Sequence, residues 1–291
     1  MCFWGLMHLT CFHRLAFAWG LIAAVAAAYP ILAAELAPPE RIVSINLCAD
    51  QMLLKLANPG SVTALGPFAR DPLLSFLADR AQAFPQVSNR TENLLHVEAD
   101  AFVVGPFDNM YMRGVLRRRG IKEIIVGRWV SLSEVKQGVK NFSNTIGVEA
   151  AGSMLISEIE IAVADLRGLV KGDRPQTFLL LHRRGYVGEG EIVSELLEIA
   201  GLINAAKGAA AQFMSVESVV ALRPSLLVVS GRDVRAEDRG LELLEHPALT
   251  RLYPPSRRIT TPDRLTICGG PSTPSLIRHL KSELMEWGRK R

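Results

Sequence analysis

Short apolar runs alternate with helix-like segments along most of the chain. The runs contain no internal proline and are rich in Val, Ile and Leu. Runs of this kind between helices predict parallel strands that are buried on both faces of a sheet. They occupy 41–45, 62–65, 101–104 and 123–126 in the first half, and 177–181, 225–229 and 258–260 in the second.

A long helical pattern separates the two series of strands. Residues 148–170 contain no proline, and Leu155, Ile159, Ala162 and Leu166 recur at helical spacing. At 1.5 Å per residue this predicts a helix of about 35 Å, ended by 172–175. Further helices are expected at about 50–57, from Ser131 through Phe142, at 191–200 up to Gly201, at 237–244 and at 273–287.

This order of elements predicts two α/β halves joined by one long helix. We place the first half at 35–147, the joining helix at 148–171 and the second half at 172–291. An internal echo supports the division. The stretch 92–105 and the stretch 217–230 each open with a glutamate, continue as a short helix and end in a buried strand. Units in matching places indicate that the two halves are built alike.

The first 34 residues differ from the rest. They contain no Asp, Glu or Lys and one arginine, Arg14, which precedes an apolar run from 15 to 34 that ends in small residues. This pattern is typical of a secretory signal peptide, and we expect cleavage after Ala34 and a periplasmic mature protein. An uncleaved membrane anchor is the alternative, because the run is long enough to span a bilayer.

Composition narrows the class of protein. The chain has 291 residues, of which 49% are hydrophobic and 21% charged, and a net charge of +4. This excludes a disordered chain. The basic residues are scattered, so no nucleic-acid partner is expected. Two cysteines, Cys48 and Cys268, lie beyond the signal segment. They are either two small buried side chains or a disulfide, and the sequence leaves both readings open.

Three stretches resemble the periplasmic binding proteins for iron complexes and cobalamin. They are 41–51, which is similar to that family's first strand and helix, 195–201, which is similar to its second-lobe helix, and 268–271. The repeated glutamate-led unit fits the same family. The resemblance covers essentially all of 35–291. It implies two Rossmann-like lobes with central, mostly parallel sheets, joined by a single rigid bridging helix.

The same resemblance implies a function and partners. It implies a solute-binding protein that holds a ligand between its lobes and delivers it to an ABC importer, a permease dimer with its ATPase subunits. One surface glutamate of each lobe would dock on the permease, and by position these are Glu92 and Glu217. No resident cofactor or metal is implied, and we expect a monomer.

The candidate ligand contacts follow the strands. In open α/β lobes, ligands bind beyond the carboxyl ends of the strands. The residues found there combine aromatic rings with arginines, which suits a flat, partly anionic metal chelate. They are Phe68, Arg70, Phe107, Asn109, Tyr111, Arg128 and Trp129 in the first half, and Arg183 and Tyr186 in the second.

The nature of the chelate is only partly indicated. Beyond the signal segment the tryptophans are Trp129 and Trp287. Cobalamin binders of the family carry more tryptophans around the site, so a ferric siderophore or haem is favoured, with a corrinoid as the alternative.

His182 is the one histidine at an expected strand end, and no paired histidine spacing indicates a bare-metal site. No nucleotide loop or nucleophile elbow indicates an enzyme. An enzyme or a membrane-anchored sensor with the same lobes remains the alternative of another class.

Overall fold

The computed structural model describes residues 37–290 except 89, 128, 173, 188–190, 209–211 and 231–241. The chain divides into two compact units, Met1–Pro38 and Pro39–Arg291. The account below concerns the second unit. The expected signal segment, the expected helix over 237–244 for its greater part, and Arg128 lie outside the described residues.

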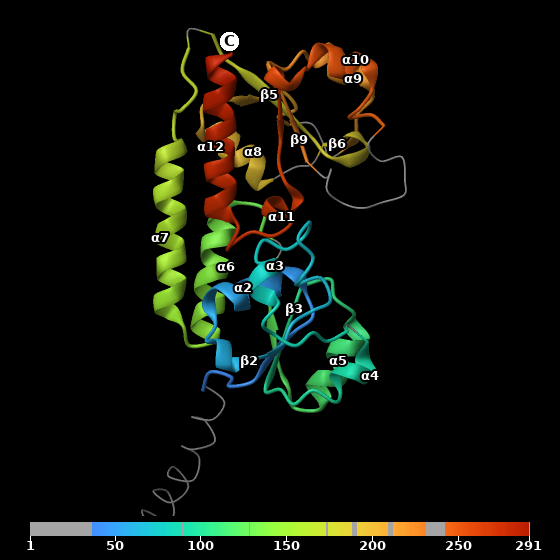
Figure 1. The fold of residues 1–291 in the computed structure, drawn as a ribbon, viewed down its shortest axis with the longest axis vertical. Helices are drawn as coiled ribbons and strands as arrows, with labels where there is room; N and C mark the ends of the chain where they lie inside the picture. The colour runs from blue at the N-terminus through green and yellow to red at the C-terminus, as the bar shows by residue number, and fades with distance from the viewer. Residues whose placement is uncertain are drawn as a thin grey trace, which may run out of the picture. The chain divides into compact units, whose positions relative to one another are not determined.

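The first lobe is built on a four-stranded sheet in the order β2-β1-β3-β4. The strands are β1 (Ile42–Ser44), β2 (Val62–Ala64), β3 (Ala101–Val104) and β4 (Lys122–Ile125). Every pairing in it is parallel. Its helices are α2 (Leu47–Leu56), α3 (Ala78–Ala81), α4 (Thr91–Leu94) and α5 (Met110–Arg118) (Figure 1).

The second lobe repeats this plan. A four-stranded sheet has the order β10-β9-β5-β7, with all pairings parallel. Its strands are β5 (Thr177–Leu181), β7 (Ile203–Asn204), β9 (Leu226–Val229) and β10 (Arg258–Thr260). A small antiparallel pair, β6 (Tyr186–Val187) with β8 (Gln212–Phe213), stands beside it. Its helices are α8 (Ile192–Ile199), α9 (Val216–Leu222), α10 (Pro247–Leu252), α11 (Asp263–Thr266) and α12 (Thr273–Arg289).

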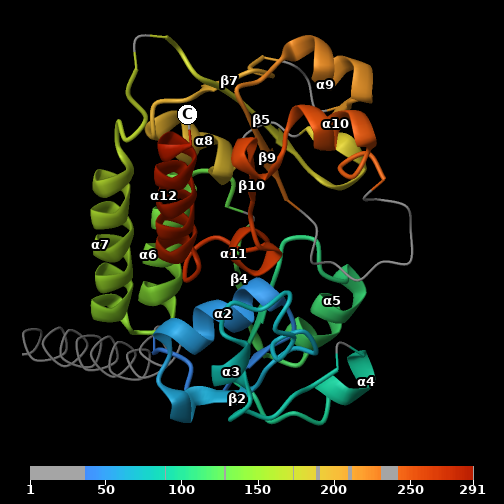
Figure 2. The same cartoon turned by 45° about the horizontal axis from the view of Figure 1, so that its top comes forward.

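Three long helices run alongside one another and connect the lobes. They are α6 (Leu132–Thr145), α7 (Glu149–Leu166) and α12, which stand side by side in Figures 1 and 2. Lys55 of α2 pairs with Glu158 of α7 at 3.2 Å, and Lys281 of α12 pairs with Asp165 near the other end of α7 at 3.2 Å. The helix α7 therefore touches both lobes, as expected of a bridging helix.

One hydrophobic core passes from lobe to lobe through these helices. It contains one face of the first sheet, with Ile42 and Val103, and one face of the second, with Phe178 and Val228. Side chains of α2, α6, α7, α8 and α12 fill the space between them. The opposite faces have separate clusters, packed on α4 and α5 in the first lobe and on α9 and α10 in the second. Because burial on both faces requires apolar side chains at nearly every position, the central strands β3, β5 and β9 are near-continuous apolar runs.

The sequence-based predictions of elements hold with small shifts. The two α/β halves, their parallel sheets and the long joining helix are confirmed. The helix expected from about 50 begins at Leu47, because the Asn46 side chain accepts hydrogen bonds from the N–H groups of Cys48 and Ala49. The long helix ends at Leu166 instead of about 170, because Gly168 takes the left-handed backbone, with φ of 61°. At 18 residues it is about 27 Å long.

Candidate functional site

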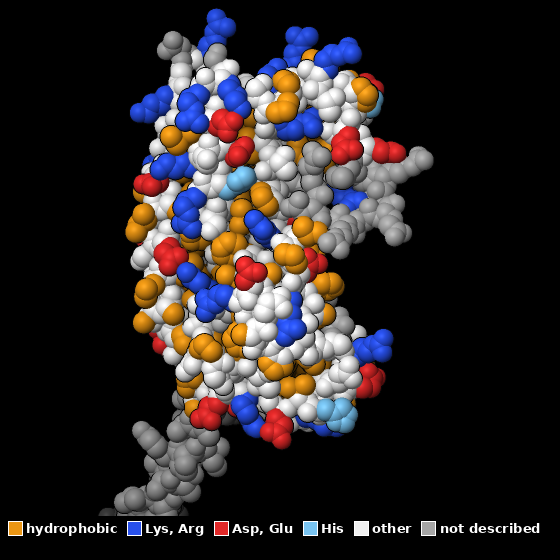
Figure 3. All heavy atoms as spheres, in the orientation of Figure 1, with side chains coloured by type: hydrophobic (Ala, Val, Ile, Leu, Met, Phe, Trp, Pro, Cys, Tyr) orange, Lys and Arg blue, Asp and Glu red, His pale blue; other side chains and the backbone are white. Residues whose placement is uncertain are grey.

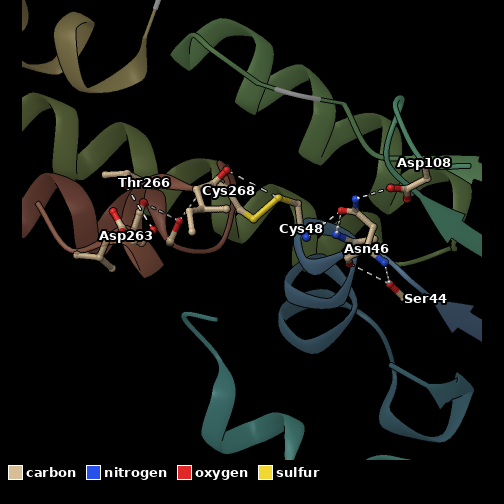
Figure 4. The surroundings of a disulfide bond; sticks show 11 residues. Ser44, Asn46, Cys48, Asp108, Asp263, Thr266 and Cys268 are labelled. Atoms are coloured by element: carbon tan, nitrogen blue, oxygen red, sulfur yellow. Dashed lines mark hydrogen bonds between the residues drawn. A yellow bond between two sulfur atoms is a disulfide. The ribbon is translucent and has the colours of Figure 1, made fainter. Parts of the chain in front are cut away.

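The carboxyl ends of both sheets lead to the same joint. Cys48 lies in the first turn of α2, directly after β1, and Cys268 lies between α11 and α12, after β10. The two form a disulfide with Cα atoms 5.2 Å apart (Figure 4). The sequence left open whether Cys48 and Cys268 are separate buried side chains or a disulfide, and in the structure they form a disulfide. Because all strands in each sheet are parallel, the loops beyond their carboxyl ends in both lobes lie on the side of this joint.

Trp129 belongs to the joint. Cβ atoms built at Gly138 of α6 and at Gly127 would lie 2.1 and 2.7 Å from Trp129 ring atoms. At Gly269 and Gly270, next to Cys268, the corresponding distances are 3.3 and 3.0 Å. The indole therefore fills a cage made by glycines of both lobes, half-buried against the common core. The sequence placed Trp129 among the ligand contacts, and in the structure its half-buried indole packs against these glycines.

A second contact across the joint involves α6. The carboxylate of Glu195 in α8 accepts a hydrogen bond from the backbone N–H of Leu132 at 2.7 Å, at the first turn of α6. Ser131 and Glu134 cap the same turn: Ser131 Oγ accepts from Glu134 N at 3.2 Å, and the Glu134 carboxylate accepts from Val130 N at 2.9 Å. Segments of the first half thus reach the second lobe at the joint.

Beyond the joint, the first lobe presents exposed aromatic side chains. Phe68 follows β2 and is 52% exposed, whereas Phe107 and Tyr111 follow β3 and are 85% and 72% exposed. Met110, at 65% exposed, lies beside them in the sequence. We call Phe68, Phe107, Met110 and Tyr111 the first-lobe rim. Large apolar side chains that are left in water at strand ends are typical of a ligand or partner surface.

Two other residues that the sequence placed among ligand contacts of this lobe have structural partners. Arg70 donates from Nε to the carbonyl of Ala81 at 3.3 Å, and also donates to the carbonyl of Phe84. Asn109 is the N-cap of α5, where its side-chain oxygen accepts from Tyr111 N at 3.0 Å and Met112 N at 3.2 Å. Both residues hold the backbone beneath the rim.

A buried carboxylate supports the loop of Phe68. Asp50 of α2 is fully buried and accepts a hydrogen bond from Gly66 N at 2.9 Å, two residues before Phe68. Burial raises the pKa of Asp50 from 3.8 to about 6, against the opposing effect of hydrogen bonds from Gly66 and Ser44. The sequence reasoning missed this residue, since a single aspartate in a helix carries no sign of its burial.

The second lobe contributes a smaller aromatic group beyond β5. His182 Nε2 and Glu191 Oε2 are 2.5 Å apart, and the His182 ring lies 6.2 Å from that of Tyr186. Tyr186 in turn packs on Phe213 of β8, with ring centroids 5.5 Å apart, and Phe213 is 69% exposed. We call His182, Tyr186 and Phe213 the second-lobe rim. Arg183 lies in the turn between His182 and Tyr186.

The sequence analysis singled out Tyr186 and His182 but not the residues they contact, Phe213 and Glu191. Phe213 is distant in sequence and reaches Tyr186 only through the pairing of β6 with β8. Figure 3 shows the surface hollowed between the two lobes, on the side where α5 lies in Figure 1.

The two glutamates of the repeated unit occupy matching places. Glu92 lies in the first turn of α4 and Glu217 in the first turn of α9, and both are exposed. The pKa of Glu217 is lowered by hydrogen bonds from its own backbone N–H and from Ser215. Each unit then continues into a buried strand, β3 or β9.

Within 37–290, outside the gaps, no three His, Cys, Asp or Glu side chains are grouped so as to hold a metal ion. No helix in that same part of the chain has the length and apolar character needed to cross a bilayer.

Comparison with known proteins gives the fold. No family model and no curated protein matches the sequence. Among solved structures, a periplasmic heme-binding protein from Pseudomonas aeruginosa matches with a TM-score of 0.66 and 18% identity, over 84% of this chain and 92% of its own. The periplasmic heme-binding protein RhuT from Roseiflexus sp. RS-1, in apo form, matches at 0.65 and 23%, over 86% and 98%. A Fe3+-hydroxamate ABC-type transport protein from Saccharomonospora viridis matches at 0.64 and 16%, over 85% and 94%. The chain thus has the two-lobed fold of substrate-binding proteins.

Proposed function

We propose that the chain is the solute-binding component of an ABC importer and that it carries a metal chelate, haem or a ferric siderophore. The observation that carries the proposal is the pair of aromatic rims beyond the carboxyl ends of the two sheets, with Phe107 85% and Phe213 69% exposed. Exposed rings on two lobes match what a large flat ligand needs, since stacking buries both faces of the ligand. Solved proteins of the same fold that bind heme or belong to a Fe3+-hydroxamate system support this class of ligand.

The second-lobe rim favours haem over a siderophore. A siderophore that fills every coordination position of its iron needs no protein ligand, whereas haem leaves axial positions for one. His182 bonds through Nε2 to Glu191 at 2.5 Å, which leaves Nδ1 as the ring nitrogen able to bind a metal. A carboxylate on the other nitrogen is the usual partner of a metal-binding imidazole. The aromatic neighbours Tyr186 and Phe213 would contact the macrocycle.

The ligand is tested by titration of the purified protein. Haemin, a ferric trihydroxamate, a ferric catecholate and cobalamin are added separately, and binding is followed by absorbance and by melting temperature. We expect haemin to bind and its Soret band to shift, and His182→Ala to change the bound spectrum. Binding of the trihydroxamate with no haemin binding would replace haem by a siderophore. Binding of cobalamin alone would favour the corrinoid alternative, and binding of none would refute the proposal.

The proposal includes export to the periplasm and the division of the mature chain into two lobes and a bridge. Residues 1–34 would be the cleaved signal peptide, leaving a periplasmic monomer with lobes at 35–147 and 172–291 and a bridge at 148–171. A disulfide between Cys48 and Cys268 supports an oxidising compartment. Intact-mass analysis of protein from the periplasm tests export. A full-length, membrane-bound product would contradict it.

Delivery would use the two exposed glutamates of the repeated unit. Glu92 and Glu217 open matching helices, one in each lobe, so a permease dimer would meet one carboxylate per subunit. If each pairs with an arginine, its loss leaves that arginine desolvated and unpaired. We expect Glu92→Ala with Glu217→Ala to keep chelate affinity and to abolish uptake and ATPase stimulation. Asp79→Ala with Glu149→Ala, at exposed first-turn carboxylates of α3 and α7, is the control. Normal uptake by the first double variant would refute this docking role.

A further inference from the structure

The loop between β3 and α5 carries the most exposed ring of the first-lobe rim, and its backbone is fastened at several points. Asp108 Oδ2 accepts from Gly105 N at 2.7 Å, which closes the loop on itself. Arg113 Nη1 donates to the carbonyl of Pro106 at 3.2 Å, and Arg113 Nε donates to Glu123 of β4 at 2.6 Å. A loop held in this way fixes the backbone position of Phe107 before any ligand arrives.

One further contact ties this loop to the joint. Asn46 Nδ2 donates to Asp108 Oδ1 at 3.4 Å (Figure 4). Asn46 is also the N-cap of α2, with Oδ1 accepting from Cys48 N at 3.0 Å and from Ala49 N at 3.3 Å. The two backbone donors fix the amide oxygen on the helix side, so the amide nitrogen must face Asp108. The residue two positions on, Cys48, is bonded to the second lobe.

The residue types suit this double role. Ser, Thr, Asp and Asn all cap helices, but only Asn has both a carbonyl oxygen and a separate N–H₂ donor. The approach also requires glycine at position 105, because a Cβ there would lie 2.6 Å from Asn46 Nδ2. Asp108 is half-buried, so its carboxylate is partly shielded from competing water.

We propose that Asn46 and Asp108 are positioning residues of the chelate site: their contact fixes the loop of Phe107 relative to α2 and, through Cys48, relative to the second lobe. The proposal rests on the proposed function. Preorganisation of this kind raises affinity by removing the cost of ordering the loop on binding.

The test separates capping from positioning. Asn46→Ser keeps a capping oxygen and removes the amide donor, whereas Asn46→Asp keeps the cap and sets a second carboxylate against Asp108. Asn58→Ser is the matched control, since Asn58 caps a short helix by accepting from Gly60 N at 3.2 Å and has no role in the loop. Haemin is the probe, with dissociation rate, melting temperature and hydrogen–deuterium exchange of 101–110 as the readouts.

We expect Asn46→Ser to weaken haemin binding roughly three- to tenfold, the scale of one ordinary hydrogen bond, since the contact with Asp108 is long at 3.4 Å. Most of this loss should appear as faster dissociation, with faster exchange at the Gly105 amide and a melting temperature equal to that of Asn58→Ser. Asn46→Asp should weaken binding more. The exchanged pair Asn46→Asp with Asp108→Asn restores an amide facing a carboxylate and should recover the affinity of the wild type.

The possible failures are distinct. If the wild type binds haemin and Asn46→Ser binds it as tightly as Asn58→Ser does, the positioning role is overturned while the proposed function stands. A double variant as weak as Asn46→Asp alone would also overturn it. If the wild type binds no chelate, the proposed function fails and the positioning role fails with it.

Discussion

The joint between the lobes and the two rims beside it are held by different forces. The joint has a disulfide, an indole caged by glycines and a hydrophobic core continuous through both lobes. The rims have exposed rings on loops whose backbones are fastened by polar side chains such as Asp50 and Asp108. The disulfide and the apolar contacts contribute most to the free energy of unfolding. The hydrogen bonds of the rim loops contribute less energy and instead fix the position of the loop backbone. Changes at the joint should therefore affect folding most, and changes at the rims should affect binding most.

Removal of the disulfide should have the largest effect. The bond closes a loop of 220 residues, and loss of a bond over so long a loop costs about 5 kcal/mol in the chain-entropy account. We expect Cys48→Ser with Cys268→Ser, or reduction of the wild type, to lower the free energy of unfolding by that order. Urea unfolding with and without reductant measures it. The double variant should be insensitive to reductant, and an equal response of variant and wild type would contradict the prediction.

Trp129→Ala should be next. The indole packs on glycines of both lobes, so truncation leaves a cavity at the joint and should cost about 3 kcal/mol of folding free energy. Gly138→Ala tests the same packing from the other side, since its Cβ would lie 2.1 Å from the ring. Urea unfolding and haemin affinity are measured on both variants. A loss of haemin affinity with an unchanged free energy of unfolding would indicate that Trp129 contacts the ligand.

Trp129 and Phe107 show how far the sequence reaches. Both are aromatic residues that follow a strand of the first lobe, so the pattern of strands places both at the ligand edge. What distinguishes them is the packing of Trp129 on glycines, two of which, Gly269 and Gly270, are distant in sequence and meet the indole only in the folded chain. Strands and helices are predictable because burial on both faces imposes apolar runs. The environment of an aromatic ring cannot be predicted in the same way, because it depends on packing against residues that are distant in sequence.

The same limit applies to the polar residues. Arg70 and Asn109 have the side chains that a chelate site needs, but Arg70 Nε and Asn109 Oδ1 bond to nearby backbone. Cys48 and Cys268 could be named as a possible pair, yet only the fold brings their Cα atoms to 5.2 Å. The disulfide reading and the aromatic rim at Phe68, Phe107 and Tyr111 were within reach of the sequence. Phe213, Asp50 and the contact of Asn46 with Asp108 were not.

The contribution of Asp50, beneath the first-lobe rim, to the free energy of unfolding should depend on pH. Burial raises its pKa from 3.8 to about 6, so the folded state holds the proton more tightly than the unfolded chain does. Its contribution to stability therefore falls as pH rises from about 4 to about 6, and stays low above that range. The two-unit shift corresponds to at most about 3 kcal/mol.

Asp50→Asn tests this dependence. The amide oxygen can still accept from Gly66 N, and the cost of a buried charge is removed. We expect the variant to unfold at higher urea than the wild type at pH 7.5 and to lose the fall in stability between pH 4 and 6. Asp79→Asn, at an exposed carboxylate of α3, is the control. A variant less stable than the wild type at pH 7.5 would show that the carboxylate is needed in its charged form.

The smallest effect on folding should come from the rims themselves. Phe107 and Phe213 are 85% and 69% exposed, so truncating either to alanine removes little buried area and should change the free energy of unfolding by less than about 0.5 kcal/mol. Each should weaken haemin binding by about 1 kcal/mol, the scale of one aromatic stacking contact. Because the rings stand on different lobes and share no partner within the described residues, the two losses should add in the double variant. Isothermal titration of the two single variants and the double variant measures this. Additive losses would mean that both lobes hold one ligand, whereas a loss confined to Phe107→Ala would place the chelate on the first lobe alone and remove the second-lobe rim from the site.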